Sequence, residues 1–151
     1  MAVDFFGYDG VETPRAVDLN KNILKGLGEE DWDKVLSFGA HRRYPAGSAI
    51  LKAGSREALL YFVVTGAVRL AGPGLHAEQI LGEGNVFGLQ SFLDAEPSAI
   101  EVVADGPVEL LLLGPEAFDQ MAAWHPRIAV QLLRDVGADL ASRLRKHNDL
   151  I

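Results

Sequence analysis

The chain contains the segments YPAGSAILKAG, at residues 44–54, and LYFVVTGAV, at residues 60–68, and these decide its fold. Both consist of short runs of β-forming residues, interrupted by Gly47, Gly54 and Gly66. Glycine gives the backbone the freedom that a tight reversal needs. The two segments therefore predict short strands joined by tight turns.

Similar β-rich runs continue over the middle of the chain, between residues 40 and 114, and glycine or proline separates most of them. Their regular spacing is typical of a β-sandwich or a β-barrel. The predicted strands are His41–Tyr44, Ser48–Leu51, Leu59–Thr65, Ala67–Leu70, Leu75–Leu81, Ile100–Val103 and Val108–Leu113.

Helical patterns flank this β-rich region on both sides. Apolar residues at helical spacing predict two short helices within residues 17–39 and two further helices within residues 115–151. Pro115 and Pro126 stand at first-turn positions, where proline opens a helix. Residues 1–16 have no periodicity and predict a flexible N-terminal arm. We therefore expect one domain, over residues 17–151.

The last predicted helix runs from Pro126 to about Lys146 and has an apolar stripe. The stripe consists of Ile128, Leu132, Leu133, Val136, Leu140 and Leu144. Asp139 and Arg143 are four residues apart, and we expect them as a pair on the polar side of the helix. The stripe can pack on its own β-region, form a homodimer or dock a protein partner, and helical periodicity does not separate these possibilities.

Composition excludes several classes of protein. The 151 residues, 48% of them hydrophobic, suit one globular domain, and the formal charge of −7 argues against nucleic acid or an anionic membrane as a partner. The absence of cysteine excludes disulfides and thiolate sites and fits a cytoplasmic location. The N-terminus resembles no signal peptide, and no stretch approaches the roughly 20 apolar residues of a membrane span.

The sequence also lacks the patterns of common enzymes. Its four histidines have no partner at metal-ligand spacing, so we expect no metal site. The glycines of residues 82–88 do not match a dinucleotide fingerprint, and Ser91 lacks the flanking glycines of a nucleophile elbow. We therefore predict a protein that is not an enzyme, with no catalytic residues and no established cofactor.

A third segment, GNVFGLQSFLDAEPSAIEVVA at residues 84–104, joins the first two in a resemblance to a known family. Together they resemble the cyclic-nucleotide-binding domains of catabolite-activator-type regulators, kinase regulatory subunits and gated channels. The resemblance covers roughly residues 24–144. It implies an eight-stranded jelly-roll β-barrel over residues 40–114, with a short cassette helix near residues 89–93, N-terminal helices at 17–39 and two C-terminal helices at 115–151. Residues 102–113 also resemble the copies of this domain attached to bacterial sulfate transporters.

The resemblance places the phosphate-binding cassette of the family in this third segment, but two charged residues are replaced. The family has a glutamate after Phe87-Gly88 and an arginine after Pro97, where this chain has Leu89 and Ser98. A carboxylate accepts hydrogen bonds from a ribose, and a guanidinium neutralises a cyclic phosphate. At about 1.5 to 3 kcal/mol for each contact, losing both costs about 3 to 6 kcal/mol, or roughly two to four orders of magnitude in affinity.

The candidate ligand-binding residues are those of the cassette: Val86, Phe87, Gly88, Leu89, Gln90, Ser91, Ser98 and Ala99. We expect a non-enzymatic regulatory or signalling module that does not bind cyclic AMP or cyclic GMP in the usual way. Alternatively, backbone amides and the serine hydroxyls hold a cyclic nucleotide or another small ligand. A third possibility is a structural dimerisation or protein-interaction domain. We do not expect DNA binding, because the sequence has no helix-turn-helix after the last predicted helix.

Overall fold

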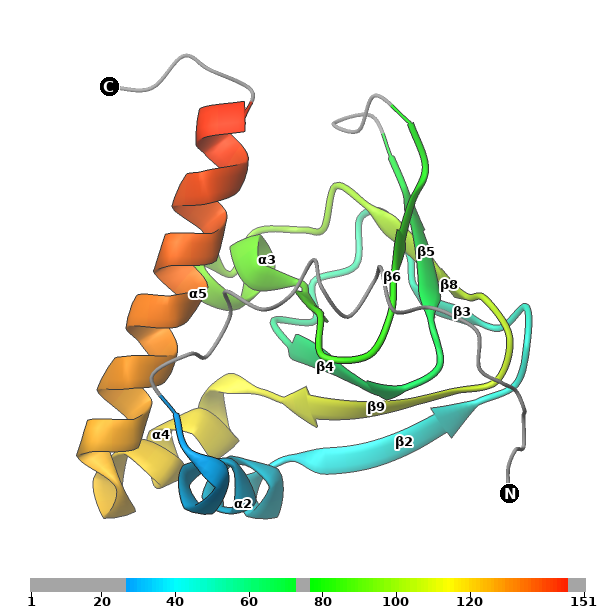
Figure 1. The fold of residues 1–151 in the computed structure, drawn as a ribbon. Helices are drawn as coiled ribbons and strands as arrows, with labels where there is room; N and C mark the ends of the chain where they lie inside the picture. The colour runs from blue at the N-terminus through cyan, green and yellow to red at the C-terminus, as the bar shows by residue number, and fades with distance from the viewer. Residues whose placement is uncertain (1–26, 73–76, 147–151) are drawn as a thin grey trace.

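The computed structural model describes residues 27–72 and 77–146, and in this range a two-layered β-region lies beside a group of helices (Figure 1). The predicted arm at residues 1–16 and the first predicted helix lie outside the described residues. The elements are α2 (Glu29–Phe38), β2 (Ala40–Tyr44), β3 (Ala49–Leu51), β4 (Leu60–Thr65), β5 (Val68–Ala71), β6 (Gln79–Leu81), β7 (Val86–Phe87), α3 (Leu89–Asp94), β8 (Glu101–Ala104), β9 (Val108–Leu113), α4 (Pro115–Trp124) and α5 (Pro126–Lys146).

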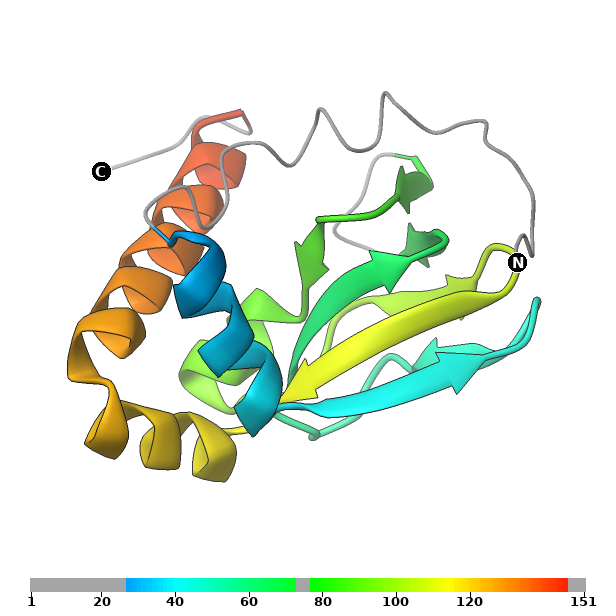
Figure 2. The same cartoon turned by 60° about the horizontal axis from the view of Figure 1, so that its bottom comes forward.

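The strands form two four-stranded antiparallel sheets with the orders β2-β9-β4-β7 and β3-β8-β5-β6 (Figure 2). The jelly-roll expectation is therefore correct for the eight described strands and wrong for the closed barrel. Three of the four edge strands, β3, β6 and β7, have only two or three residues. Such short edges do not continue the hydrogen-bonded ladder from one sheet to the other, and the domain is a β-sandwich.

Two apolar clusters hold the layers together, and strand alternation assigns residues to them. On β4, Tyr61 and Val63 belong to the cluster between the sheets, whereas Leu60 and Phe62 belong to the cluster between the first sheet and the helices. Successive side chains of a strand point to opposite faces. Strand β4 is buried on both faces, which explains why its sequence is a continuous apolar run.

Helix α5 packs on the first sheet with only part of its predicted apolar stripe. Ile128, Leu132 and Val136 are buried in the helix-side cluster, but Leu133 and Leu144 are 40% and 47% exposed. At 100° per residue the six predicted positions span roughly 160° of the helix surface, which is wider than one contact face. The stripe therefore splits into a buried face and an exposed one.

An ion pair joins the first described helix to the start of α5. The Arg127 guanidinium lies 2.6 Å from the Asp31 carboxylate, and the backbone N–H of Gly28 donates to the same carboxylate at 3.3 Å. The hydrogen bond from Arg127 is the main cause that lowers the pKa of Asp31 below its usual value. Glu29, Glu30 and Asp31 occupy the first turn of α2, where acidic side chains are favoured.

Candidate functional site

The cassette begins on β7, the shortest strand, and turns sharply into α3. Tyr61 of β4 pairs with Phe87, and Phe62 pairs with Val86. The next residue, Gly88, adopts the left-handed conformation with φ of 84° and caps α3, where its carbonyl accepts the Phe92 N–H at 3.1 Å. The predicted cassette helix is thus confirmed at Leu89–Asp94.

Gly88 is required here for its small size as well as for its conformation. A Cβ atom at this position would lie 2.5 Å from the Leu59 carbonyl oxygen and 2.9 Å from the ring of Tyr61. Neither approach is compatible with the backbone as it stands. The Phe87-Gly88 pair thus fixes where the chain leaves β7.

An aromatic stack supports the cassette from inside the sandwich. The rings of Tyr61 and Phe87 are parallel within 5°, with centroids 4.6 Å apart. The Tyr61 hydroxyl donates to the Glu57 carboxylate at 3.3 Å. Burial, followed by the negative charge of Glu57, raises the pKa of Tyr61 well above its usual value. Tyr61 therefore remains a neutral hydrogen-bond donor.

Leu89, at the position of the family glutamate, faces the helices. It is buried at 3% exposure and belongs to the helix-side cluster with Leu132 and Val136, whereas Phe87 belongs to the cluster between the sheets. Ser91 is also buried, and Gln90 is exposed. A charged side chain in the orientation of Leu89 would be surrounded by apolar groups.

Ser98, at the position of the family arginine, is engaged in local hydrogen bonds. Its hydroxyl accepts the Ile100 N–H at 3.1 Å and donates to the Ile100 carbonyl at 3.0 Å. Its backbone N–H donates to the Ser55 carbonyl and its carbonyl accepts the Gly54 N–H, both at 2.8 Å. Ser98 thereby ties its own loop to residues 54–55. The next candidate, Ala99, is exposed.

One residue at the cassette was not among the candidates. The Arg143 guanidinium of α5 donates to the Val86 carbonyl at 3.2 Å and lies 2.7 Å from the Asp139 carboxylate. The predicted pair of Asp139 and Arg143 is confirmed, and the structure places it on the side of α5 that contacts β7. Asp139 is four residues before Arg143, so the pair was visible in the sequence, whereas its direction depends on how α5 packs.

Comparisons with known proteins agree with this architecture. The family described as "Cyclic nucleotide-binding domain" matches residues 41–125. The chain belongs to this family. It is 34% identical over 128 residues to the cyclic AMP receptor protein of Thermus thermophilus, which covers 82% of this chain and 57% of that protein.

Two further relatives extend the comparison. Glutaminase 2 of Bradyrhizobium diazoefficiens is 32% identical over 143 residues, which is 93% of this chain and 22% of that protein. The crystal structure of the Thermus thermophilus catabolite activator protein matches with a TM-score of 0.69 and 35% identity, over 82% of this chain and 58% of that one. The chain thus spans less than two thirds of the length of each of these relatives.

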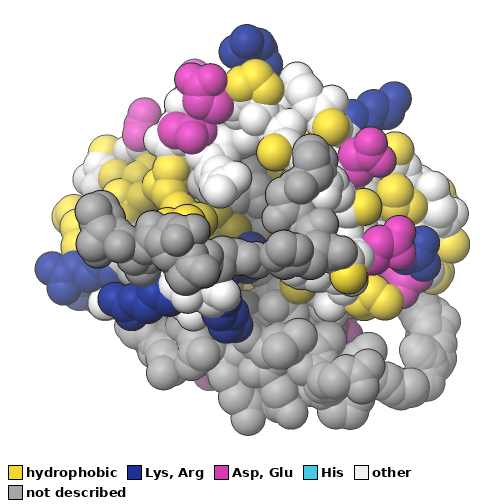
Figure 3. All heavy atoms as spheres, turned by 90° about the horizontal axis from the view of Figure 1, so that it is seen from above, with side chains coloured by type: hydrophobic (Ala, Val, Ile, Leu, Met, Phe, Trp, Pro, Cys, Tyr) yellow, Lys and Arg dark blue, Asp and Glu magenta, His cyan; other side chains and the backbone are white. Residues whose placement is uncertain are grey.

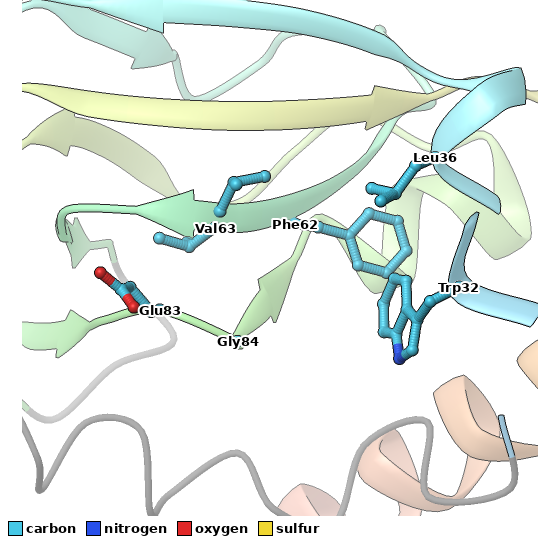
Figure 4. Close-up of a pocket in the computed structure, with 7 residues that line it drawn as sticks. Trp32, Leu36, Phe62, Val63, Glu83 and Gly84 are labelled. Carbon is cyan, nitrogen blue, oxygen red and sulfur yellow. The ribbon is translucent and has the colours of Figure 1, made fainter. Parts of the chain in front are cut away.

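This cyclic nucleotide-binding domain also has a hollow outside its cassette. A pocket of about 350 Å³ lies between α2 and β4, and Trp32 meets Phe62 edge to face in it, with centroids 5.7 Å apart (Figure 4). Glu83 and Gly84, which precede β7, line its other side. None of the eight cassette candidates lines this pocket.

Residues 27–72 and 77–146 include no group of three or more histidine, cysteine or acidic side chains that could hold a metal ion. Within the same range, no helix combines the length and the apolar character needed to cross a membrane.

Proposed function

We propose that this cyclic nucleotide-binding domain is a non-enzymatic regulatory module whose cassette does not bind cyclic AMP or cyclic GMP in the usual way. The proposal rests on the surroundings of Leu89 and Ser98, the two residues that replace the charged residues of the family. Leu89 is buried among apolar side chains. The Ser98 hydroxyl donates a hydrogen bond to the Ile100 carbonyl and accepts one from the Ile100 N–H. Neither position offers a charged group to a phosphate or a ribose.

The free-energy cost of freeing Ser98 and Leu89 from their present contacts supports the proposal that the cassette does not bind a cyclic nucleotide in the usual way. A phosphate that accepted a hydrogen bond from the Ser98 hydroxyl would have to replace the bond that this hydroxyl donates to the Ile100 carbonyl, so the net gain from the new contact would be small. Leu89 contributes to the interface between α3 and α5 rather than to a polar cavity. In this proposal the cassette is a packed structural element or the site of a less polar ligand, and α5 is the element that moves or docks.

The lengths of the relatives fit a module within a larger assembly. The matched region makes up 57% of the receptor protein and 22% of the glutaminase. We propose that this domain regulates a partner. The finer resemblance to the domains attached to sulfate transporters remains a prediction.

The proposal is tested by titrating the purified protein with cyclic AMP, cyclic GMP and cyclic di-nucleotides up to millimolar concentration, using calorimetry and thermal shift. Any ligand of the native state raises the melting temperature by mass action. We expect no saturable response to any of the three. A saturable response that weakens in Ser91→Ala and Ser98→Ala would overturn the proposal in favour of binding through backbone amides and serines.

A gain-of-function variant complements the titration. Leu89→Glu combined with Ser98→Arg replaces both missing charges and should create cyclic nucleotide binding if the cassette geometry is otherwise that of the family. The melting temperature of the ligand-free double variant is measured first, because it reports whether the new carboxylate is tolerated in the helix-side cluster. A stable double variant without binding would show that the cassette differs in shape as well as in charge.

A second candidate function, homodimerisation through α5, is favoured by the exposed face of that helix. Val130, Leu133, Gly137, Leu140 and Leu144 follow one another at spacings of three and four residues. Val130 is 51% exposed, and Leu133 and Leu144 are exposed as well. Viewed from above, hydrophobic side chains gather beside Lys and Arg on the side of the molecule where α5 lies (Figure 3). Such spacing is that of a two-helix seam, and Gly137 would allow close approach.

A further inference from the structure

Strand β2 is the one edge of the described sheets that is long enough to accept another strand. It has five residues, Ala40–Tyr44, whereas the other three edges, β3, β6 and β7, have two or three. Its inner side pairs with β9 along its whole length, and no described strand pairs with its outer side (Figures 1 and 2). In an antiparallel ladder, every second residue directs its N–H and C=O groups away from the partner strand. The outer side of β2 therefore offers backbone donors and acceptors to an added strand.

The side chains of β2 are exposed on both faces of the sheet. Residues 40–43 are all exposed, whereas the residues opposite them on β9 include Leu110 and Leu111, which are fully buried. Successive side chains of a strand point to opposite faces. Four exposed residues in a row therefore mean that neither the second sheet nor the helices cover this strand. Both faces beside β2 are accessible to the side chains of an added strand.

Two guanidinium groups of β2 have no ion pair within the described part of the chain. Arg42 lies opposite Leu110 of β9, on the face toward the second sheet. Arg43 lies opposite Glu109, on the face toward the helices, but the Glu109 carboxylate is placed beside His41, with Nδ1 at 3.4 Å. The chain as a whole has a formal charge of −7. Strand β2 thus presents one free cation on each face, at the edge of a protein that is acidic overall.

We propose that the outer edge of β2 is a docking site for an extended acidic segment of a partner protein, which adds to the first sheet as a further strand. In strand addition, backbone hydrogen bonds provide the affinity and the facing side chains provide the specificity. Two consecutive acidic residues of the partner would lie opposite Arg42 and Arg43, one on each face, with Cβ atoms about 5 Å from those of the arginines. The site uses no residue of the cassette or of α5, so the inference does not depend on the function proposed for them.

The same two arginines disfavour a second copy of this chain as the added strand. Antiparallel pairing of two β2 strands centred on Arg42 or on Arg43 places that arginine opposite its own copy. Pairing centred between them places Arg42 opposite Arg43. Like charges directly opposite each other destabilise a sheet, and charged edge strands are one means by which proteins avoid such self-pairing. The arginines of β2 therefore select an acidic strand against a second copy of this one.

Titration of the purified protein with the acetylated peptide VTEEVTV, followed by NMR, tests the docking site. We expect saturable shifts of the β2 amides and slower hydrogen exchange of those β2 amides that face outward. In the double variant Arg42→Glu with Arg43→Glu, the dissociation constant should rise at least about tenfold, because attraction becomes repulsion. The control, Arg134→Glu with Arg145→Glu, makes the same change of net charge at exposed positions of α5 and should leave binding unchanged. Equal losses in the two double variants, with melting temperatures that show both to be folded, would overturn the docking site.

Altered peptides separate strand addition from simple charge attraction. The peptide VTKKVTV keeps the β-forming residues with the opposite charge and should not bind. Only every second amide of an added strand faces its neighbour, so one of the two alternate patterns of N-methylation of VTEEVTV should weaken binding at least about tenfold and the other should be tolerated. Equal binding of both methylated peptides would overturn strand addition. No shift of the β2 amides at millimolar peptide would also overturn it, and would leave the arginines with only a protective role at the edge. No cyclic nucleotide is present, so either result is independent of the titration that tests the proposed function.

Discussion

The ring of Phe87 lies flat on the ring of Tyr61, with 4.6 Å between their centroids, so the first turn of the cassette is built on an aromatic side chain of β4. Tyr61 is 1% exposed, and its hydroxyl donates a hydrogen bond to the Glu57 carboxylate. The stack therefore places an ionisable group in the interior, next to the strand that leads into α3. Its protonation state is linked to the stability of this part of the fold.

We predict a loss of stability at alkaline pH that depends on Tyr61. Burial and Glu57 raise the pKa of Tyr61 above its ordinary value of 10.0. The folded protein thus keeps a proton that the unfolded chain loses above pH 10, and stability should fall by up to about 1.4 kcal/mol per pH unit as the pH rises beyond that value. Tyr61→Phe preserves the stack but has no proton to lose.

Urea unfolding of both proteins between pH 8 and 11 measures this difference. The slope of the unfolding free energy above pH 10 should be less steep in Tyr61→Phe than in the wild type. Identical slopes would mean that Tyr61 ionises as easily in the folded protein as in the unfolded one.

A second prediction concerns Gly88 and uses Gly47 as its matched control. Both glycines have positive φ, at 84° and 83°. A Cβ at Gly88 would lie 2.5 Å from the Leu59 carbonyl, whereas nothing lies within 4 Å of one at Gly47. Gly47→Ala should cost about 1 kcal/mol for the left-handed conformation, and Gly88→Ala at least about 2 kcal/mol.

Chemical denaturation of the two variants measures the difference. Equal losses would indicate that the backbone around Gly88 relaxes without strain, and the close approach to Leu59 would then have no energetic role.

A third prediction tests the orientation of Leu89. Because this side chain is buried with the helix-side cluster, Leu89→Ala should lower the unfolding free energy by about 2 to 4 kcal/mol. The next residue, Gln90, is exposed, and Gln90→Ala should change it by less than about 0.5 kcal/mol. Denaturant titration compares the unfolding free energies of the two variants. A loss below about 1 kcal/mol of unfolding free energy in Leu89→Ala would mean that the Leu89 side chain is not closely packed in the helix-side cluster.

Much of the fold could be predicted from the sequence because β-rich runs and helix-opening prolines are recognised within short segments. The runs at His41–Tyr44 and Val108–Leu113 became β2 and β9 with the predicted bounds apart from Ala40, and proline opened α4 and α5 where it was expected. Strand β7 was missed because two residues cannot show periodicity. Its existence depends on pairing with β4, a contact between residues far apart in the sequence.

The site shows the same division between local and distant effects. Residue type alone indicated that Leu89 and Ser98 lack the charges of the family cassette. The direction of Leu89 and the engagement of Ser98 with residues 54–55 follow from packing and could not be read from the sequence. The sequence shows Arg143 as a partner of Asp139, but nothing in the last helix reveals that it reaches Val86.

The last prediction concerns the exposed face of α5 and the second candidate function. If two copies pair through this face, Leu133 and Leu144 lie in the seam, and Leu133→Glu together with Leu144→Glu should weaken the dimer at least about tenfold, or by 1.4 kcal/mol, because carboxylates would be buried there. Ala138→Glu introduces one carboxylate at an exposed position away from this seam and is the control.

Sedimentation or light scattering across a range of concentrations measures the mass. The wild type and Ala138→Glu should approach twice the 16.3 kDa of one chain, and the double variant should remain near 16.3 kDa. A wild-type mass that stays at one chain at every concentration would exclude the dimer. The exposed leucines of α5 would then be free to contact a different protein, as the proposed regulatory function expects.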